Sequence, residues 1–154
     1  MKRKTTGSIL ALCFFGAAVC FGDDPQMGTW KLNEAKSKFA PGRPKNHTVV
    51  YEATGDNVKI TVDGNDKDGK ATHNEWTGKF DGKDYPVTGD ASSDTRQYIR
   101  ASPNRLNFVS KLAGKVALAG SVLVSADGKS RTVTATGTDA KGKKVTQTSV
   151  YDRQ

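Results

Sequence analysis

The chain has 154 residues, of which 24 are Lys or Arg, 16 are Asp or Glu and 35% are hydrophobic. This length favours one domain rather than two. Both cysteines, Cys13 and Cys20, lie in the first 22 residues, so a chain cleaved after Gly22 can form neither a disulfide nor a cysteine-ligated zinc site.

The first 22 residues have the pattern of a secretory signal peptide. Residues 2–4 are basic, and residues 9–21 are an apolar stretch shorter than the roughly 20 residues that a membrane-spanning helix needs. Small residues favour cleavage after Gly22, while lipid attachment at Cys20 is a weaker alternative. We therefore expect a secreted or periplasmic protein whose mature domain is residues 23–154.

The mature chain is mildly basic, because without the three cations of the leader 21 bases face 16 acids, a formal charge of +5. The lysines are scattered over predicted turns and outward strand positions, which is typical of a solvated surface. An alternative is that they contact polyanionic surfaces.

From residue 28 onward, short segments rich in Val, Thr and aromatic residues alternate with turns of Gly, Asp, Asn and Lys. This pattern predicts an all-β chain of sequential hairpins, since Asp-Gly and Asn-containing pairs accept the positive φ angles of tight turns. Strands are predicted at 28–33, 47–53, 57–63, 71–80, 84–88, 95–101, 104–112, 115–125, 130–137 and 143–152. The one helix candidate is Glu34 to Phe39, capped by Asn33 and stopped by Pro41-Gly42.

Alternation along the strands predicts which side chains point inward. The predicted inward faces are Val58, Ile60 and Val62; Trp76, Gly78 and Phe80; Leu106, Phe108, Ser110 and Leu112; and Val116, Leu118, Gly120, Val122 and Val124. An open sheet of this many strands would leave two unpaired edges, so we expect a closed antiparallel up-and-down barrel of about 8–10 strands. Its interior would be filled by side chains or would hold one small ligand.

The first predicted strand reads Met27-Gly28-Thr29-Trp30-Lys31-Leu32-Asn33, and its Gly-x-Trp resembles the calycin group, the lipocalins and fatty-acid-binding proteins. This resemblance implies a lipocalin-like barrel in which Trp30, after Gly28, closes the base and Arg153 packs over it. The segment 28–42, with YPVTGD at 85–90 and the closing VYDRQ, also resembles small secreted bacterial proteins without an assigned function.

No local motif predicts catalysis or a metal site. His73 and Glu75 share a strand face, but its other residues are polar and a third ligand is missing. Residues 64–70 approach a phosphate-binding loop, but Ala71 stands where Ser or Thr is required, so a hairpin turn is favoured. Paired inward carboxylates and a recognisable nucleophile are absent from the predicted pattern.

Arg96, Tyr98 and Arg100 alternate on one face of their strand, opposite Gln97, Ile99 and Ala101. If the Tyr98 face points inward, the buried guanidinium groups would suit an anionic ligand, because a buried guanidinium needs a partner. We favour the other orientation, which buries Ile99 and places both arginines on the surface.

The leading hypothesis is a non-catalytic barrel that binds a small, partly apolar ligand in its lumen. The predicted ligand-binding residues are Tyr51, Trp76, Phe80, Tyr98, Arg100 and Phe108. The alternatives are a filled barrel that acts as an envelope or extracellular interaction module, and a hydrolase or isomerase on a calycin barrel. We expect no cofactor, no metal, no nucleic acid and no stable membrane insertion after leader cleavage, and the oligomeric state stays open.

Overall fold

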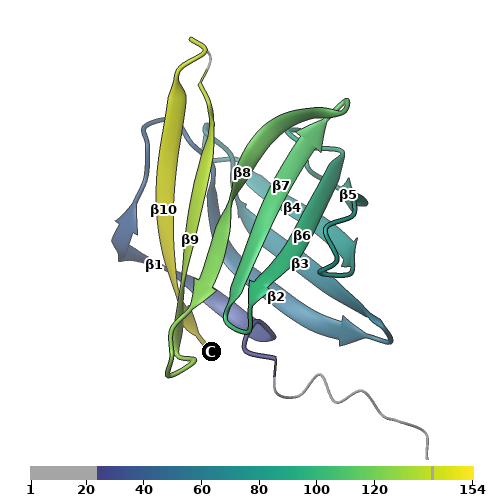
Figure 1. Cartoon of the computed structure of the whole chain (residues 1–154). Coiled ribbons are helices and arrows are strands. Elements are labelled where there is room, and N and C mark those ends of the chain that lie inside the picture. The colour runs from purple at the N-terminus through teal and green to yellow at the C-terminus, as the bar shows by residue number, and fades with distance from the viewer. Residues whose placement is uncertain (1–23, 140) are drawn as a thin grey trace, which may run out of the picture.

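A computed structural model describes residues 24–139 and 141–154, which form a closed β-barrel (Figure 1). Its strands are β1 (Gly28–Lys38), β2 (Lys45–Thr54), β3 (Asn57–Asn65), β4 (Ala71–Gly78), β5 (Tyr85–Thr88), β6 (Thr95–Ser102), β7 (Arg105–Leu112), β8 (Lys115–Val124), β9 (Ser130–Thr138) and β10 (Lys144–Arg153). Each strand pairs antiparallel with the next along the chain, and β1 also pairs with β10. The predicted all-β, up-and-down barrel is confirmed.

The signal peptide predicted for residues 1–22 lies outside the described residues. Of the residues described, none belongs to a helix long and apolar enough to cross a membrane. The predicted strands match the observed ones to within two residues at every end but one, the end of β1.

The helix predicted after Asn33 is wrong, because β1 continues through this segment to Lys38. The pairing with β10 shifts here, since Asn33 lies opposite Val150 but Lys38 lies opposite Thr148. Asn33 does behave as a cap, and its Oδ1 accepts a hydrogen bond from the Lys36 N–H at 3.2 Å. The capping signal therefore marks a bulge in a strand, where one local turn is made without a following helix.

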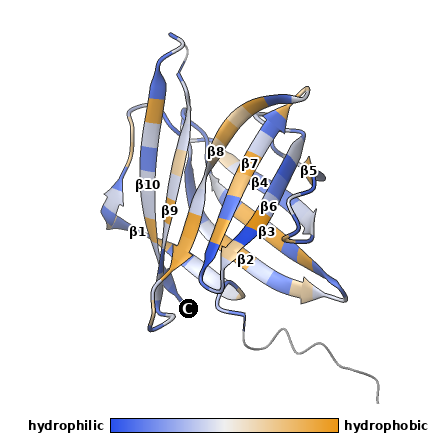
Figure 2. Cartoon of the chain, viewed as in Figure 1, coloured by the Kyte–Doolittle hydropathy of each residue, from blue (hydrophilic) through white to orange (hydrophobic). Residues whose placement is uncertain are grey.

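Hydrophobic and hydrophilic residues alternate along the strands, as expected when one face lines the barrel and the other faces solvent (Figure 2). The predicted inward residues of β3 are all buried. The buried core consists of Trp30, Val49, Tyr51, Val58, Ile60, Val62, Trp76, Val87, Tyr98, Leu106, Phe108, Val122, Val124 and Tyr151.

Two predicted inward residues near the β7–β8 turn are exposed instead. Ser110 lies opposite Leu118 but Lys111 lies opposite Val116, so one residue of β8 has no partner and the alternation reverses beyond it. This bulge turns Val116 outward, where it is 63% exposed. Leu112 keeps the inward parity but lies at the end of its strand, where it is half exposed. The inward assignment of these two side chains is therefore wrong.

One end of the barrel is closed by Trp30, which is fully buried. Its indole N–H donates a 3.0 Å hydrogen bond to the carbonyl oxygen of Gln26, and the Gln26 side chain donates to the carbonyl of Asn104. The Arg153 guanidinium lies 4.4 Å from the centre of the indole ring. Gly28 has a φ of 106°, and a Cβ there would lie 3.4 Å from Arg153 Nη1. Gly28, Trp30 and Arg153 thus meet at this end, which we call the base.

Candidate functional site

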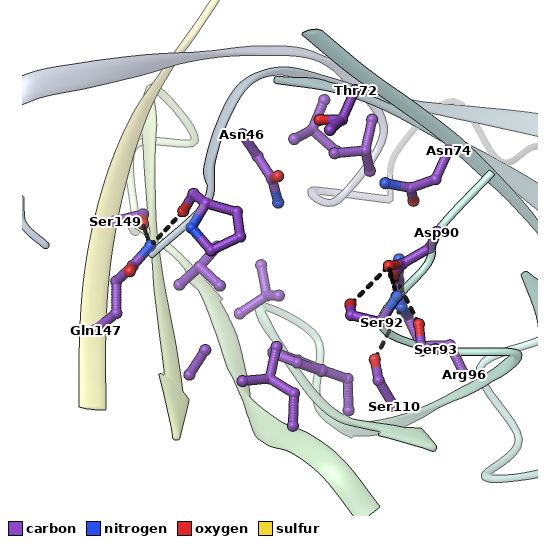
Figure 3. Close-up of a pocket in the computed structure, with 18 of the residues that line it drawn as sticks. Asn46, Thr72, Asn74, Asp90, Ser92, Ser93, Arg96, Ser110, Gln147 and Ser149 are labelled. Carbon is purple, nitrogen blue, oxygen red and sulfur yellow. Dashed lines mark hydrogen bonds and ion pairs between the residues drawn. The ribbon is translucent and has the colours of Figure 1, made fainter. Parts of the chain in front are cut away.

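A cavity of about 440 Å³ lies inside the barrel between the base and the opposite, open end. Its apolar wall is formed by inward residues of several strands, namely Val49, Val62, Phe108, Leu118, Val122, Val133 and Ala135, together with the rings of Tyr51, Tyr98 and Tyr151. Polar side chains surround it toward the open end, as Figure 3 shows for Asn46, Thr72, Asn74, Asp90, Ser92, Ser93, Arg96, Ser110, Gln147 and Ser149.

A cluster of hydrogen-bonded polar side chains is centred on Asp90, in the loop between β5 and β6 (Figure 3). Its carboxylate accepts hydrogen bonds from the hydroxyl groups of Ser92 and Ser93, both at 2.6 Å, and from Arg96 Nη2 at 3.1 Å. Arg96 Nε also donates to the Ser110 hydroxyl at 3.1 Å. Burial alone would raise the pKa of Asp90, but the two serines and Arg96 outweigh it and hold the pKa below its ordinary value. This carboxylate and guanidinium satisfy each other.

A second guanidinium, that of Arg131, lies at the end of the cavity nearest the base, which we call the lower end. Arg131 is 2% exposed, and its guanidinium carbon lies 4.8–5.0 Å from the ring centres of Tyr51, Trp30 and Tyr151. Its Nε and Nη1 have no hydrogen-bond partner among the residues that the structure describes. Such a cation is held by aromatic rings but is not neutralised by a carboxylate.

The tyrosines beside Arg131 are kept protonated. Burial raises the pKa of Tyr51 well above its ordinary value, and the positive charge of Arg131 opposes this shift only in part. Burial likewise raises the pKa of Tyr151, again against the charge of Arg131. Both phenols therefore remain neutral hydrogen-bond donors at physiological pH.

Other polar atoms of the cavity are also open to a partner. Asn74 Oδ1 is buried without a hydrogen bond among residues 24–139 and 141–154. On the opposite side, Gln147 Nε2 makes long contacts of 3.3 Å to the Pro44 carbonyl and 3.5 Å to the Ser149 hydroxyl (Figure 3). Groups of this kind accept water or a polar part of a ligand.

The structure separates the six predicted ligand-binding residues into two sets. Tyr51, Tyr98 and Phe108 line the cavity. Trp76 and Phe80 stack on each other, with ring centres 6.3 Å apart and an angle of 8° between planes, and neither borders the cavity.

Arg100, the sixth of these residues, does not border the cavity either. It forms an ion pair with Asp24 and donates to the Pro103 carbonyl at 2.9 Å. The orientation favoured for its strand is wrong: Tyr98 is 6% exposed and Ile99 is 48% exposed, so the Tyr98 face points inward.

Sequence reasoning missed Arg131 and Tyr151, although a signal for both was present. Along β9 the outward residues are Ser or Thr, while Arg131 shares its parity with Val133 and Ala135. Register places Tyr151 directly opposite Arg131 on β10. The apolar alternation of β9 therefore predicts an inward arginine.

The His73 cluster lies on the outside of the barrel. His73 Nδ1 is 2.6 Å from Asp63 Oδ1, and its Nε2 is 3.6 Å from Glu75 Oε1, which also pairs with Lys59 at 2.8 Å. The pKa of His73 is raised, mainly by the hydrogen bond with Asp63. Over the part of the chain that the structure describes, no group of three or more His, Cys, Asp or Glu residues could hold a metal ion.

Fold and site together define a closed antiparallel β-barrel with an internal cavity. No family model matches the chain, and no curated protein matches it. Among solved structures, it is similar to EF1p2_mFAP2b bound to DFHBI, with 12% identity, a TM-score of 0.47, and coverage of 84% of this chain and 94% of that one. A redesigned β-barrel has 12% identity, a TM-score of 0.43, and coverage of 84% and 92%. The fold assignment rests on the strand order of the chain itself.

Proposed function

We propose that this protein binds one small, partly apolar molecule in the lumen of its barrel and does not catalyse a reaction. The observation that carries the proposal is the cavity of about 440 Å³ above a tightly plugged base. Pockets for small molecules commonly measure about 300–1,000 Å³, and protein interiors otherwise leave few voids larger than a water molecule. The volume of the lumen therefore supports binding of one small molecule.

The distribution of polarity supports a ligand with two unlike ends. Aliphatic and aromatic side chains such as Val62 and Phe108 form the wall, while Asn74, Asp90 and Gln147 face the cavity nearer the open end. An apolar wall supplies binding free energy by burial, and a few fixed polar groups set the orientation of the ligand.

The arrangement of charges supports binding rather than turnover. Asp90 is the carboxylate at the centre of the cavity's polar cluster. Burial acts to raise its pKa, but the hydrogen bonds from Ser92 and Ser93 and the charge of Arg96 lower it by more. A general base works best with a pKa near the operating pH, so this carboxylate is a poor one. We place the protein in the periplasm or outside the cell, on the strength of the leader predicted for residues 1–22.

Native mass spectrometry of residues 23–154, purified from the secreted or periplasmic fraction of the protein's own host, tests the proposal. We expect an adduct of defined mass that is lost on denaturation. Uptake of N-phenyl-1-naphthylamine, a neutral dye that fluoresces in apolar surroundings, should be saturable at one dye per chain. A clean apo mass together with no dye uptake would favour the alternative of a filled interaction module that binds polyanionic surfaces.

Two variants locate the dye. Ala135 lines the cavity, so Ala135→Trp should fill the lumen and abolish uptake. Thr134 is its neighbour on β9 with the opposite parity, so Thr134→Trp places the same ring outside the barrel and should leave uptake unchanged. Equal dye affinity in both variants would place the dye outside the lumen.

A further inference from the structure

We propose that the ligand is an organic anion whose single charged group binds Arg131 at the lower end of the lumen, while its apolar body lies against the cavity wall. This inference rests on the proposed function, since it names the class of molecule that the lumen takes. It follows from one buried cation to which the described residues give no counter-charge.

The two buried arginines of the cavity differ in one respect. Arg96 meets the Asp90 carboxylate at 3.1 Å and the Ser110 hydroxyl at 3.1 Å. Arg131 is at least as deeply buried, yet among the described residues it has no carboxylate within ion-pair distance, and its Nε and Nη1 have no acceptor. A buried charge without a partner is costly, so a protein retains one where something else supplies the partner.

The aromatic rings around Arg131 stabilise its buried charge only in part. Trp30, Tyr51 and Tyr151 lie about 5 Å from the guanidinium and attract its positive charge. Ring faces offer no oxygen lone pair to the guanidinium N–H groups, which pair best with a carboxylate or another oxyanion. The neutral hydroxyl groups of Tyr51 and Tyr151 would add donors beside such an anion.

The other charges of the cavity favour an anion at this end. Three arginines and two aspartates line the cavity. Asp90 is engaged by Arg96, and Asp66 accepts the backbone N–H groups of Asp68 and Lys70, both at 2.9 Å. Neither carboxylate neutralises Arg131. Both aspartates and Arg43 lie nearer the open end, so the lower end of the cavity carries the positive charge of Arg131 with no carboxylate of the cavity beside it.

A matched pair of dyes tests the charge directly. The sulfonate 8-anilinonaphthalene-1-sulfonate has the same rings as N-phenyl-1-naphthylamine and adds one negative charge. We expect the wild-type lumen to bind the sulfonate more tightly. Arg131→Met should weaken sulfonate binding by about tenfold or more, the loss expected for a hydrogen bond to a charged group, and should change binding of the neutral dye by less than about twofold.

Arg105→Met is the matched control. Arg105 is exposed on β7, so this substitution also removes one positive charge, but from the surface and not from the cavity. It should change the affinity of neither dye. If Arg131→Met and Arg105→Met bind the sulfonate equally well, the anion site is refuted while lumen binding stands. If the wild-type protein binds neither dye and also shows a clean apo mass, both the anion site and the proposed function are refuted.

A measurement on the wild-type protein keeps the test independent of how well Arg131→Met folds. Octanoate and octan-1-ol have the same chain and differ in charge, so each can compete with bound N-phenyl-1-naphthylamine. Octanoate should displace the dye at a concentration at least about tenfold lower. Equal displacement by the two competitors would overturn the assignment of an anionic ligand, although the lumen would still be a binding site.

Discussion

Replacing Trp30 by Ala should strongly destabilise the barrel. The indole is fully buried, donates a hydrogen bond to the Gln26 carbonyl at 3.0 Å, and lies between the guanidinium groups of Arg131 at 4.9 Å and Arg153 at 4.4 Å. The substitution removes all of these contacts together and leaves a void at the base.

The magnitude follows from these contacts. Truncating a buried Trp to Ala costs about 3–5 kcal/mol, including the cavity left behind. Two cation–π contacts, worth about 0.5–2 kcal/mol each, place Trp30→Ala in the upper part of that range. With a urea m value of about 1.5 kcal/mol/M, a loss of about 4 kcal/mol lowers the denaturation midpoint by about 2.7 M.

Urea unfolding followed by far-ultraviolet circular dichroism measures the effect, because tryptophan fluorescence would change with the substitution itself. Trp30→Phe keeps a ring but loses the N–H donor, so it should cost about 1–2 kcal/mol. Leu123→Ala alters a side chain that is 47% exposed and should cost less than about 1 kcal/mol. A midpoint for Trp30→Ala equal to that of wild type would refute the assignment of Trp30 as the plug of the base.

Two further predictions concern backbone packing and pH. A Cβ at Gly120 would lie 2.0 Å from the Thr134 carbonyl oxygen on the adjacent strand, so Gly120→Ala must push β8 and β9 apart; we expect a loss of about 2 kcal/mol and a fall in Tm of roughly 6–10 °C by circular dichroism, and an unchanged Tm would contradict this close approach. The hydrogen bond with Asp63 raises the pKa of His73, so an NMR titration should place it above about 6.5 and Asp63→Asn should lower it. The pKa of His73 is higher in the folded than in the unfolded protein. The contribution of the His73–Asp63 contact to folding stability is therefore fully present below the unfolded-state pKa and is lost as the pH rises through the folded-state pKa. A His73 pKa unaffected by Asp63→Asn would show that this contact does not form in solution.

The strands could be predicted from the sequence because the turns between them are local chemistry. At Asp127-Gly128-Lys129, for example, the Asp127 carboxylate accepts the Lys129 N–H at 3.0 Å and Gly128 adopts a φ of 70°. Such a turn depends on three or four adjacent residues. The bulges in β1 and β8 depend instead on pairing with strands distant in sequence, which explains why the helix after Asn33 and the inward position of Val116 were wrong.

The orientation of β6 depends on a bulge beside its turn to β7. Each face of this strand mixes polar and apolar residues, so its own alternation does not decide between them. Across the tight turn at Pro103-Asn104, Ser102 lies opposite Arg105, and an unbroken register from there would place Tyr98 opposite Val109, on the outward face. The pairing shifts by one residue between Arg100 and Ser102, so Tyr98 lies opposite Phe108 instead and shares its inward face.

The open lumen itself follows from a gradient of side-chain size along β9. Its inward positions, from the base toward the open end, are Arg131, Val133, Ala135 and Gly137. The large end of this series packs against Trp30, while the small residues leave space that a filled barrel of this diameter would occupy with Leu or Phe. The inward positions of β9 therefore account for two features of the cavity. The small residues Ala135 and Gly137 leave its space open, and Arg131 places a cation at its lower end.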